Sequence, residues 1–338
     1  MITTPFRALA LLPLALCMAW IGGLGTASTL SGAEQSLDLT LVGTIHGAAD
    51  LIEVSDGRAY VTSEQTLTIF DLADPASPTR AGSYTFPEKI WGFEVVGSMV
   101  YAAVDFFGLG ILDVSDIGEP KLRGAIKTPG QAKGVGVYRN RALVADHVEG
   151  VDLIDVSDPS NPVALGSFYL DGYPRDVAAA GPLAFAVDAP TGVYVFDLSR
   201  PGPPEPIGMV QSARSPSSVE TPSASGEEAP NVVCMVGGGL LQVYDVSDPS
   251  APVNTADFPT PGGRPLRVTV RGALAYVADG PAGLQVVDLS TPSAPAIVAT
   301  YATPKPARDI AVSDSHVFVA IGEREGDEEG EVLVLQQS

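Results

Sequence analysis

The stretch that decides the fold covers residues 283–290 and reads GLQVVDLS, followed by Pro292 and Pro295. Five earlier segments carry the same kind of apolar run with an aspartate at the same place. The shared aspartates are Asp71, Asp113, Asp155, Asp197, Asp245 and Asp288, at spacings of 42, 42, 42, 48 and 43 residues. A near-constant period in this range is typical of propellers and solenoids, in which each repeat forms one supersecondary unit.

One period contains four short apolar segments separated by turn residues. Within residues 263–304 these segments are 266–270, 274–278, 284–289 and 297–301. They are rich in Val, Ile, Leu, Ala and Tyr, which favours strands. No segment after residue 34 has a convincing helical period. Four short antiparallel strands form a propeller blade, whose two faces are buried against neighbouring blades.

Counting third strands predicts how the ring closes. A seventh third strand follows the six with aspartates, at residues 330–335, and no fourth strand follows it. The segment VGTI at residues 42–45 resembles LGSF at 165–168, which is a fourth strand. We therefore expect an all-β fold over residues 37–338. It is a seven-bladed β-propeller of four-stranded antiparallel blades, whose last blade is closed by the N-terminal strand.

The repeated aspartates have a structural explanation. The segment at residues 155–162 reads DVSDPSNP, and residues 245–252 read DVSDPSAP. Aspartate and serine side chains bond nearby backbone amides, and proline presets φ, so the chain reverses after the third strand. We interpret these aspartates as turn formers.

The units at residues 286–290 and 155–162 resemble the LVIVD-repeat family of bacterial exported and cell-surface proteins. The segment AYVADG at residues 275–280 fits the same pattern, and the resemblance extends over roughly residues 37–338. It implies a propeller, but no agreed activity and no catalytic residues.

Residues 1–33 are predicted to be a secretory signal peptide. Arg7 precedes an apolar run over residues 8–24, and a stretch of small residues follows at 25–33. A retained membrane anchor and, through Cys17, a lipoprotein are the alternatives. Removal leaves Cys234 as the one thiol, so the fold has no intrachain disulfide. We expect a protein of the periplasm, the cell surface or the medium, with no integral membrane span after processing.

Charge and histidine content exclude several function classes. The formal net charge is −21, and loss of Arg7 makes it −22, which disfavours binding to nucleic acids. His46, His147 and His316 fall at different blade positions, so neither a multi-histidine metal site nor a Ser-His-Asp triad is indicated. We therefore predict no catalytic and no metal-binding residues, and no cofactor. Calcium is the one ion considered, at the acidic segment 323–331, which we interpret as a solvated loop.

The two faces of the ring differ in composition. The Asp-Pro turns join third to fourth strands, so they lie on one face, called the turn face, together with the loops between first and second strands. The loops between second and third strands, and the links into each first strand, lie on the opposite face, called the 2–3 face. Variable residues gather on the 2–3 face, where we expect ligands to bind.

The candidate ligand-binding residues on the 2–3 face are aromatic or charged. They are Trp91, Phe106, Phe107, Lys133, Asp146, His147, Arg175, Asp176, Arg267, Arg308 and Asp309. The three aromatic residues suit a protein anchor or a sugar-stacking platform, with packing between blades as the alternative. The charged residues near the axis form either a ligand site or a set of paired charges, and Glu53 and Glu94 are expected to line the channel.

The functional hypothesis is a non-catalytic, monomeric, exported binding or scaffold propeller. It recognises an extracytoplasmic protein or a polysaccharide through the 2–3 face. The alternative is a propeller hydrolase or lyase with a central divalent metal ion.

Overall fold

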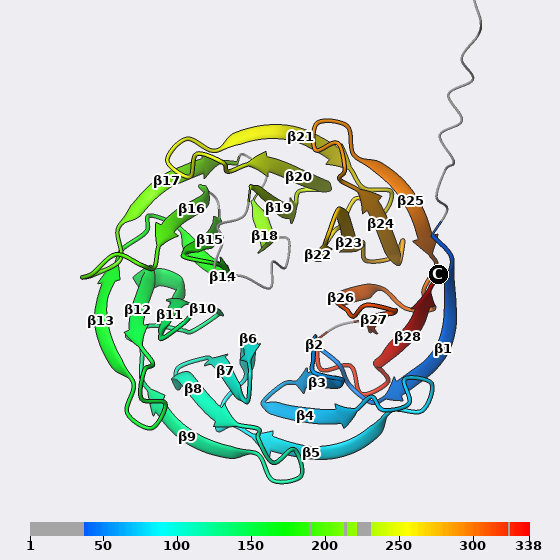
Figure 1. Ribbon diagram of the computed structural model, residues 1–338, viewed down its shortest axis with the longest axis horizontal. Coiled ribbons are helices and arrows are strands. Elements are labelled where there is room, and N and C mark those ends of the chain that lie inside the picture. Colours follow the sequence, from blue (N-terminus) through cyan, green and yellow to red (C-terminus); the bar gives the residue numbers. More distant parts are fainter. Residues whose placement is uncertain (1–36, 190, 213–214, 222–230, 324) are drawn as a thin grey trace, which may run out of the picture. The chain divides into compact units, whose positions relative to one another are not determined.

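The computed structural model describes residues 37–189, 191–212, 215–221, 231–323 and 325–338. In these residues the strands form seven four-stranded antiparallel sheets arranged in a ring (Figure 1). The predicted all-β, seven-bladed propeller is confirmed. The predicted signal peptide at residues 1–33 lies outside the described residues. No helix in the described part of the chain is long and apolar enough to span a membrane.

Each of the first six blades is built from four consecutive strands. Blade 1 contains β2 (Leu51–Ser55), β3 (Arg58–Ser63), β4 (Thr66–Asp71) and β5 (Thr79–Thr85); blade 2 contains β6 (Ile90–Val96), β7 (Met99–Val104), β8 (Gly108–Asp113) and β9 (Lys121–Ile126). Blade 3 contains β10 (Gly134–Tyr138), β11 (Arg141–Ala145), β12 (Val151–Asp155) and β13 (Val163–Phe168), with the 3-10 helix η1 (His147–Glu149) between β11 and β12. Blade 4 contains β14 (Tyr173–Ala180), β15 (Leu183–Ala189), β16 (Gly192–Asp197) and β17 (Pro206–Gln211). Blade 5 contains β18 (Pro216–Glu220), β19 (Val232–Gly237), β20 (Leu240–Asp245) and β21 (Val253–Pro259), and blade 6 contains β22 (Arg267–Arg271), β23 (Leu274–Ala278), β24 (Leu284–Asp288) and β25 (Ala296–Tyr301).

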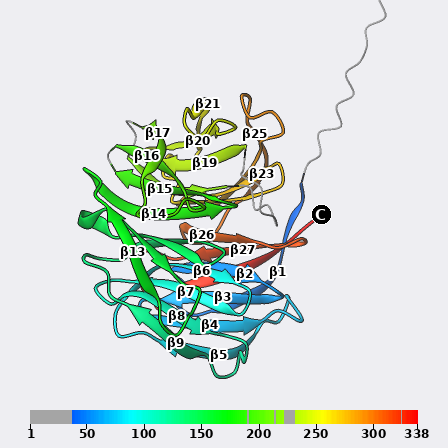
Figure 2. The same ribbon diagram turned by 60° about the vertical axis from the view of Figure 1, so that its left-hand side comes forward.

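Blade 7 joins the two ends of the described chain. Its inner strands are β26 (Ala307–Val312), β27 (His316–Ile321) and β28 (Glu331–Gln337), and its outer strand is β1 (Leu39–His46). The register runs from Leu39 opposite Gln337 to His46 opposite Glu331. Figure 1 shows β1 beside β28, and Figure 2 shows the C-terminal end of the chain beside the start of β1. This is the predicted closure, and it pairs an edge that blade 7 would otherwise expose.

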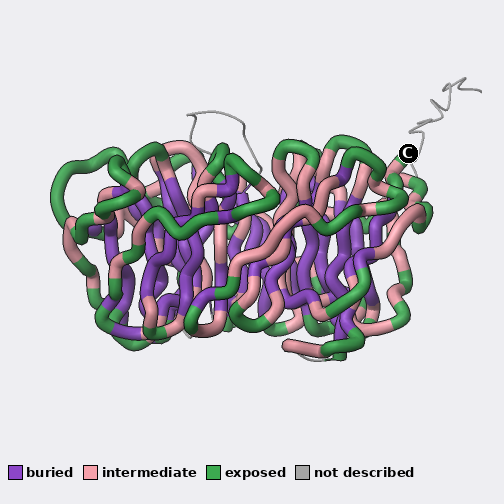
Figure 3. Tube along the Cα trace, turned by 90° about the horizontal axis from the view of Figure 1, so that it is seen from below, coloured by how far each residue is buried: buried purple, intermediate pink, exposed green. Residues whose placement is uncertain are grey.

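The hydrophobic core lies between neighbouring blades. Inner strands such as β8 are almost wholly buried, whereas the outer strand β9 of the same blade is mostly exposed. One apolar cluster joins Leu67 and Ile69 of blade 1 to Ile90, Val100 and Leu112 of blade 2. Figure 3 shows buried residues along the strands and exposed residues in the loops at both faces. The blades therefore stabilise one another, which explains why inner strands are apolar on both sides.

The repeated aspartates are turn formers, as predicted. Asp155 accepts a hydrogen bond from the backbone N–H of Ser157 at 2.9 Å, and Asp158 accepts one from Ser160 at 3.0 Å. Corresponding bonds form at Asp71, Asp113, Asp197, Asp245 and Asp288. Hydrogen bonds from Ser157 lower the pKa of the exposed Asp155 carboxyl, so the turn favours the charged carboxylate.

Five of these six turns pack against a glycine on the outer strand of the preceding blade. The turn after Asp288 faces β21, which contains no glycine. A Cβ atom at Gly82 of β5 would overlap the carbonyl oxygen of Ile117 in the next turn. The carbonyl oxygen of Pro159 lies in the same way against Gly124, and that of Pro75 against Gly43 on the closing strand. The glycine and the turn therefore form one inter-blade contact, in which a backbone needs the space of a side chain.

The substitution Gly82→Val tests this contact. We expect the free energy of unfolding to fall by about 1–3 kcal/mol, because the added side chain overpacks a site closed by backbone. Ala164→Val, at an exposed position of the outer strand β13, is the control and should change stability by less than about 0.5 kcal/mol. Chemical denaturation measures both. Equal stability of the two variants would contradict the contact.

Candidate functional site

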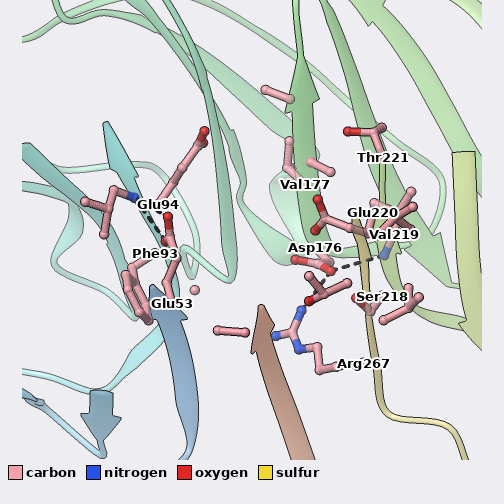
Figure 4. Close-up of a pocket in the computed structure, with 18 of the residues that line it drawn as sticks. Glu53, Phe93, Glu94, Asp176, Val177, Ser218, Val219, Glu220, Thr221 and Arg267 are labelled. Atoms are coloured by element: carbon pink, nitrogen blue, oxygen red, sulfur yellow. Dashed lines mark hydrogen bonds and ion pairs between the residues drawn. The ribbon is translucent and has the colours of Figure 1, made fainter. Parts of the chain in front are cut away.

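A cavity of about 500 Å³ runs along the axis of the ring, between the first strands of the seven blades. Its lining residues come from β2, β6, β10, β14, β18, β22 and β26. Five of them are carboxylic acids and two are arginines. We call this space the axial cavity. Figure 4 shows Glu53, Glu94, Asp176, Glu220 and Arg267 in its lining.

The strand registers place the polar lining in two layers. In the layer nearer the 2–3 face, Asp176, Arg267 and Asp309 lie opposite Val187, Ala278 and Ala320. In the next layer, Glu53, Glu94 and Glu220 lie opposite Tyr60, Tyr101 and Cys234. The predicted positions of Asp176, Arg267, Asp309, Glu53 and Glu94 near the axis are confirmed. Sequence analysis missed Glu220, because the long spacing in blade 5 obscures its register.

Most of these carboxyl groups bond the backbone of the next blade. Asp309 accepts a hydrogen bond from the N–H of Ile52 at 2.8 Å. Glu53 accepts one from Val95 at 3.0 Å, and Glu94 accepts one from Val137 at 2.6 Å. These bonds run from blade 7 to blade 1, then to blade 2 and blade 3, so they hold neighbouring first strands together.

Asp176 and Arg267 form the ion pair of the axial cavity. Arg267 Nη1 lies 2.8 Å from Asp176 Oδ2, which also accepts a hydrogen bond from the N–H of Val219 at 3.2 Å. Burial opposes the charge on Arg267, but Asp176 and Asp309 outweigh it, so the pKa of Arg267 is raised. This arrangement links blades 4, 5 and 6 around one guanidinium.

The remaining carboxyl groups of the axial cavity are protonated more readily than ordinary acids. Burial raises the pKa of Glu94 to about 8 and that of Glu220 to about 8, with Asp176 adding to the shift at Glu220. Burial also raises the pKa of Asp309 to about 6. The pKa of Glu53 rises well above its ordinary value through burial and then through the charge of Glu94. A buried carboxyl group with little positive charge beside it holds its proton.

The mouth of the axial cavity on the 2–3 face is a second recess, of about 180 Å³, and Trp91 lines it. The ammonium groups of Lys133 and Lys89 lie 3.6 and 4.4 Å from the centroid of the Trp91 ring. These cation–π contacts occupy the ring. The sequence hypothesis of a sugar-stacking platform at Trp91 therefore gives way to an indole that holds two lysines.

The acidic segment 323–331 keeps exposed carboxylates at Glu323, Glu325, Glu328 and Glu329, as predicted for a solvated loop, but part of it also pairs with basic residues. Glu325 lies 2.5 Å from Lys89 Nζ and 3.5 Å from Arg308 Nη2. Asp327 lies 3.6 Å from Lys305 Nζ. Opposite charges on the links between blades attract this loop to the mouth, so Arg308 takes part in paired charges as one of the two sequence hypotheses proposed.

Asp146 lies in the interior of a loop. It accepts hydrogen bonds from Thr128 Oγ1 at 2.7 Å and from the N–H of Gly130 at 2.5 Å. Asp279 makes the same pair of bonds to Thr260 and Gly262. The sequence contains a signal for this contact that the sequence analysis did not use: the segment TPG occurs at residues 128–130 and again at 260–262, ahead of the two aspartates. Each carboxyl group therefore holds the chain segment that leads into the first strand of its own blade.

Exposed apolar and cationic side chains gather on the 2–3 face of blades 2 to 4. Phe106, Val148, Tyr169 and Tyr173 are 54%, 45%, 66% and 48% exposed. The His147 ring lies 5.2 Å from that of Tyr173, and burial followed by the charges of Lys133 and Arg175 lowers its pKa. Phe107 turns inward instead and packs edge-on against Phe86 at 6.1 Å. We call the surface of Phe106, Lys133, His147, Val148, Tyr169, Tyr173 and Arg175 the aromatic patch.

The LVIVD repeat family matches four segments of the chain, residues 46–86, 90–128, 129–169 and 262–303. The chain belongs to the LVIVD-repeat family. The matched segments correspond to blades 1, 2, 3 and 6 of this LVIVD-repeat propeller. Blades 4, 5 and 7 lie outside them, and these blades supply Asp176, Glu220 and Asp309 to the axial cavity.

Comparison with solved structures supports the same fold. The LVIVD-repeat propeller is similar to the crystal structure of the computationally designed Ika8 protein, with a TM-score of 0.64 and 9% sequence identity. The likeness covers 88% of this chain and 99% of that one. At this identity it shows the fold alone. No curated protein matches the chain.

The described residues contain no group of three or more His, Cys, Asp or Glu side chains placed to hold a metal ion. Cys234 is fully buried, and burial raises the pKa of its thiol to about 12. A thiol with this pKa stays protonated and is a poor nucleophile. The chemistry that the LVIVD-repeat propeller offers is therefore concentrated in the carboxyl groups of the axial cavity and in the aromatic patch.

The raised pKa values make stability depend on pH. Between about pH 4.5 and pH 8 the folded protein keeps protons on Glu94 and Glu220 that the unfolded chain releases. Stability is therefore highest below this window and falls as the pH rises through it, by at most about 1.4 kcal/mol per pH unit for each group. We expect the unfolding midpoint to be lower at pH 8 than at pH 5.

The double variant Glu94→Gln/Glu220→Gln should flatten this dependence, because neither amide titrates. Glu205→Gln, at an exposed position on the turn face, changes the net charge in the same direction and should keep the native slope. Thermal unfolding followed by circular dichroism at pH 5, 6, 7 and 8 measures the three slopes. A double variant with the native slope would show that these carboxyl groups are not the source.

Proposed function

We propose that this LVIVD-repeat propeller is a non-catalytic binding or scaffold protein that acts outside the cytoplasm. Its aromatic patch recognises a protein or a polysaccharide. The observation that carries the proposal is the exposure of Phe106, Tyr169 and Tyr173 on one side of the 2–3 face. Exposed aromatic side chains grouped on a rigid surface are typical of binding sites, because they bury much apolar area at a low cost in side-chain entropy.

The charges around the patch support recognition of a polar partner. Lys133 and Arg175 have no carboxylate within 4.0 Å in the described part of the chain. Arg175 is exposed, and Lys133 leans on Trp91. Unpaired cations beside aromatic rings suit a partner that presents acidic or hydroxyl groups, and they fix its orientation.

The rest of the 2–3 face supplies a rigid support. Asp146 fixes the link below His147 through its bonds to Thr128 and Gly130. The inner strands β11 and β15 beneath the patch are buried almost throughout. A surface built on such strands keeps its shape, so binding needs little reordering. Action outside the cytoplasm rests on the predicted signal peptide at residues 1–33.

The double variant Phe106→Ala/Tyr173→Ala tests the patch. Labelled protein is applied to a polysaccharide array, and a photo-reactive residue at position 169 captures protein partners on intact cells. We expect at least a tenfold loss of the array or crosslinking signal in the double variant, which corresponds to about 1.4 kcal/mol.

The control removes exposed apolar side-chain surface elsewhere on the ring. Val253→Ala/Ile297→Ala changes two exposed residues on the outer strands β21 and β25 and should keep the full signal. A patch variant that binds as well as this control would overturn the proposal, provided that both variants unfold at the native temperature.

Elemental analysis of the purified protein tests the alternative of a metal-dependent hydrolase or lyase. We expect less than about 0.1 equivalent of calcium or zinc per chain after dialysis, and no thermal shift when either ion is added, because carboxyl groups with raised pKa values bind metal only after losing a proton. One equivalent of tightly held metal would favour the enzyme instead.

A further inference from the structure

Each blade places one residue at the mouth of the axial cavity on the 2–3 face. The strand registers identify it as the residue just before the layer that contains Asp176, Arg267 and Asp309. We call these residues the mouth ring. In the order of the blades they are Asp50, Trp91, Lys133, Arg175, Ser217, Leu266 and Arg308. The mouth ring therefore contains three cations, in blades 3, 4 and 7.

β-Bulges occur at the mouth ring. In the pairing of β6 with β7 the register skips Trp91, and it skips Arg175, Ser217 and Arg308 in the same way in blades 4, 5 and 7. The other registers described between first and second strands are continuous. A bulged residue has no residue opposite it, and bulges commonly redirect a side chain beside a functional site. The irregular backbone of the first strands is thus confined to the mouth.

Two carboxylates of the described residues lie at this mouth, and both have partners. Asp50 accepts backbone N–H bonds with both of its oxygens, at 2.8 and 2.7 Å. Glu325 is shared by two cations, since it lies 2.5 Å from Lys89 Nζ and 3.5 Å from Arg308 Nη2. Glu325 therefore shows how a carboxylate binds at the mouth, with a cation on either side.

The other two cations of the mouth ring lack such a partner. Neither Lys133 nor Arg175 forms an ion pair in the part of the chain that the structure describes. Burial lowers the pKa of Lys133, and the charges of Lys89 and Arg175 lower it further. The charges of Asp105 and Glu325 oppose this shift only in part. An anion bound between Lys133 and Arg175 would reduce the repulsion between these cations.

An aromatic ring lies next to this unpaired charge. Tyr173 and Arg175 are both exposed, whereas Pro174 between them is buried, so the ring and the guanidinium group lie on the same outer side of β14. A ligand that contacts both must carry a flat apolar face beside a negative group. In a uronic acid the two features belong to one rigid sugar ring. In an acidic peptide they belong to separate flexible side chains, whose ordering costs binding free energy.

We propose that the aromatic patch and the mouth ring together bind an acidic polysaccharide built from uronic acids. A carboxylate of the polymer binds Lys133 and Arg175, and the faces of its sugar rings pack on Tyr173 and Phe106. The protein carries a formal net charge of −21, so most of its surface repels the polymer and the mouth attracts it. The inference rests on the proposed binding role of the aromatic patch and names the class of its ligand.

Isothermal titration with hexamers of galacturonic acid and of mannuronic acid tests this inference, in buffer without divalent ions. We expect saturable binding of at least one hexamer. Its methyl ester keeps the sugar rings but has no charge, so it should bind about tenfold more weakly, because the charge-assisted hydrogen bonds are lost. Raising the ionic strength from about 0.02 M to about 0.2 M should weaken binding of the acid and leave the ester unchanged.

Substitutions at the mouth ring locate the charge. Lys133→Gln and Arg175→Gln should each weaken binding of the acid about tenfold and leave the ester unchanged. Lys121→Gln removes the same charge at an exposed position of β9 on the turn face and should keep the native affinity. Glu325→Gln should strengthen binding of the acid about threefold, because Lys89 and Arg308 then become available to the polymer.

Three results would overturn the acidic polysaccharide. They are no saturable binding of either hexamer at millimolar concentration, equal affinity for the acid and its ester, and native affinity in both cation variants. Tighter binding of hexaglutamate than of either hexamer would also overturn it, in favour of an acidic peptide.

The patch variant Phe106→Ala/Tyr173→Ala separates this inference from the proposed function. If it loses binding of acid and ester alike while the cation variants bind normally, the aromatic patch is a binding site and the inference about charge fails. Thermal unfolding checks that every variant folds.

Discussion

The pairing of β1 with β28 closes the ring, and the remaining contacts depend on it. Without β1, blade 7 would expose the edge of β28, and no outer strand would receive the turn at Pro75 and Ala76 of blade 1. The ladder extends past the strands, since Asp38 and Ser338 exchange two backbone hydrogen bonds. Closure also brings blade 7 against blade 1, which allows Asp309 to bond the backbone of Ile52.

Two kinds of inter-blade contact repeat around this ring, one at the outer strands and one near the axis. At the outer strands, a turn packs its backbone against a glycine such as Gly124. At the axis, a carboxyl group such as Glu94 accepts an N–H from the next first strand. Apolar clusters fill the space between. The outer contact recurs because it needs only a backbone carbonyl and the space left by a glycine. The axial contact varies from blade to blade, because each first strand carries different polar residues.

This variation at the axis separates stability from binding. A carboxyl group that uses both oxygens in backbone bonds, as Asp309 does, stabilises the ring. One that is buried with a single bond from the adjacent N–H, as Glu220 is with Thr221, is a cost to the folded state unless a proton neutralises it. The two candidate sites therefore differ in origin, since the aromatic patch is exposed apolar area and the axial cavity is buried charge.

The sequence by itself determined the number of blades, the turn chemistry and the closing strand. All three follow from local patterns, namely the spacing of Asp71 to Asp288, the Asp-Pro turns and the VGTI segment at residues 42–45. The tertiary structure decided which charges meet. Glu325 pairs with Lys89 across 236 positions of the chain, a contact that no local pattern indicates. The tertiary structure also decided that Phe107 packs against the core while Phe106 is exposed. Local patterns specify strands and turns because backbone bonding is local, whereas ion pairs and cavities form only when the closed ring brings distant links together.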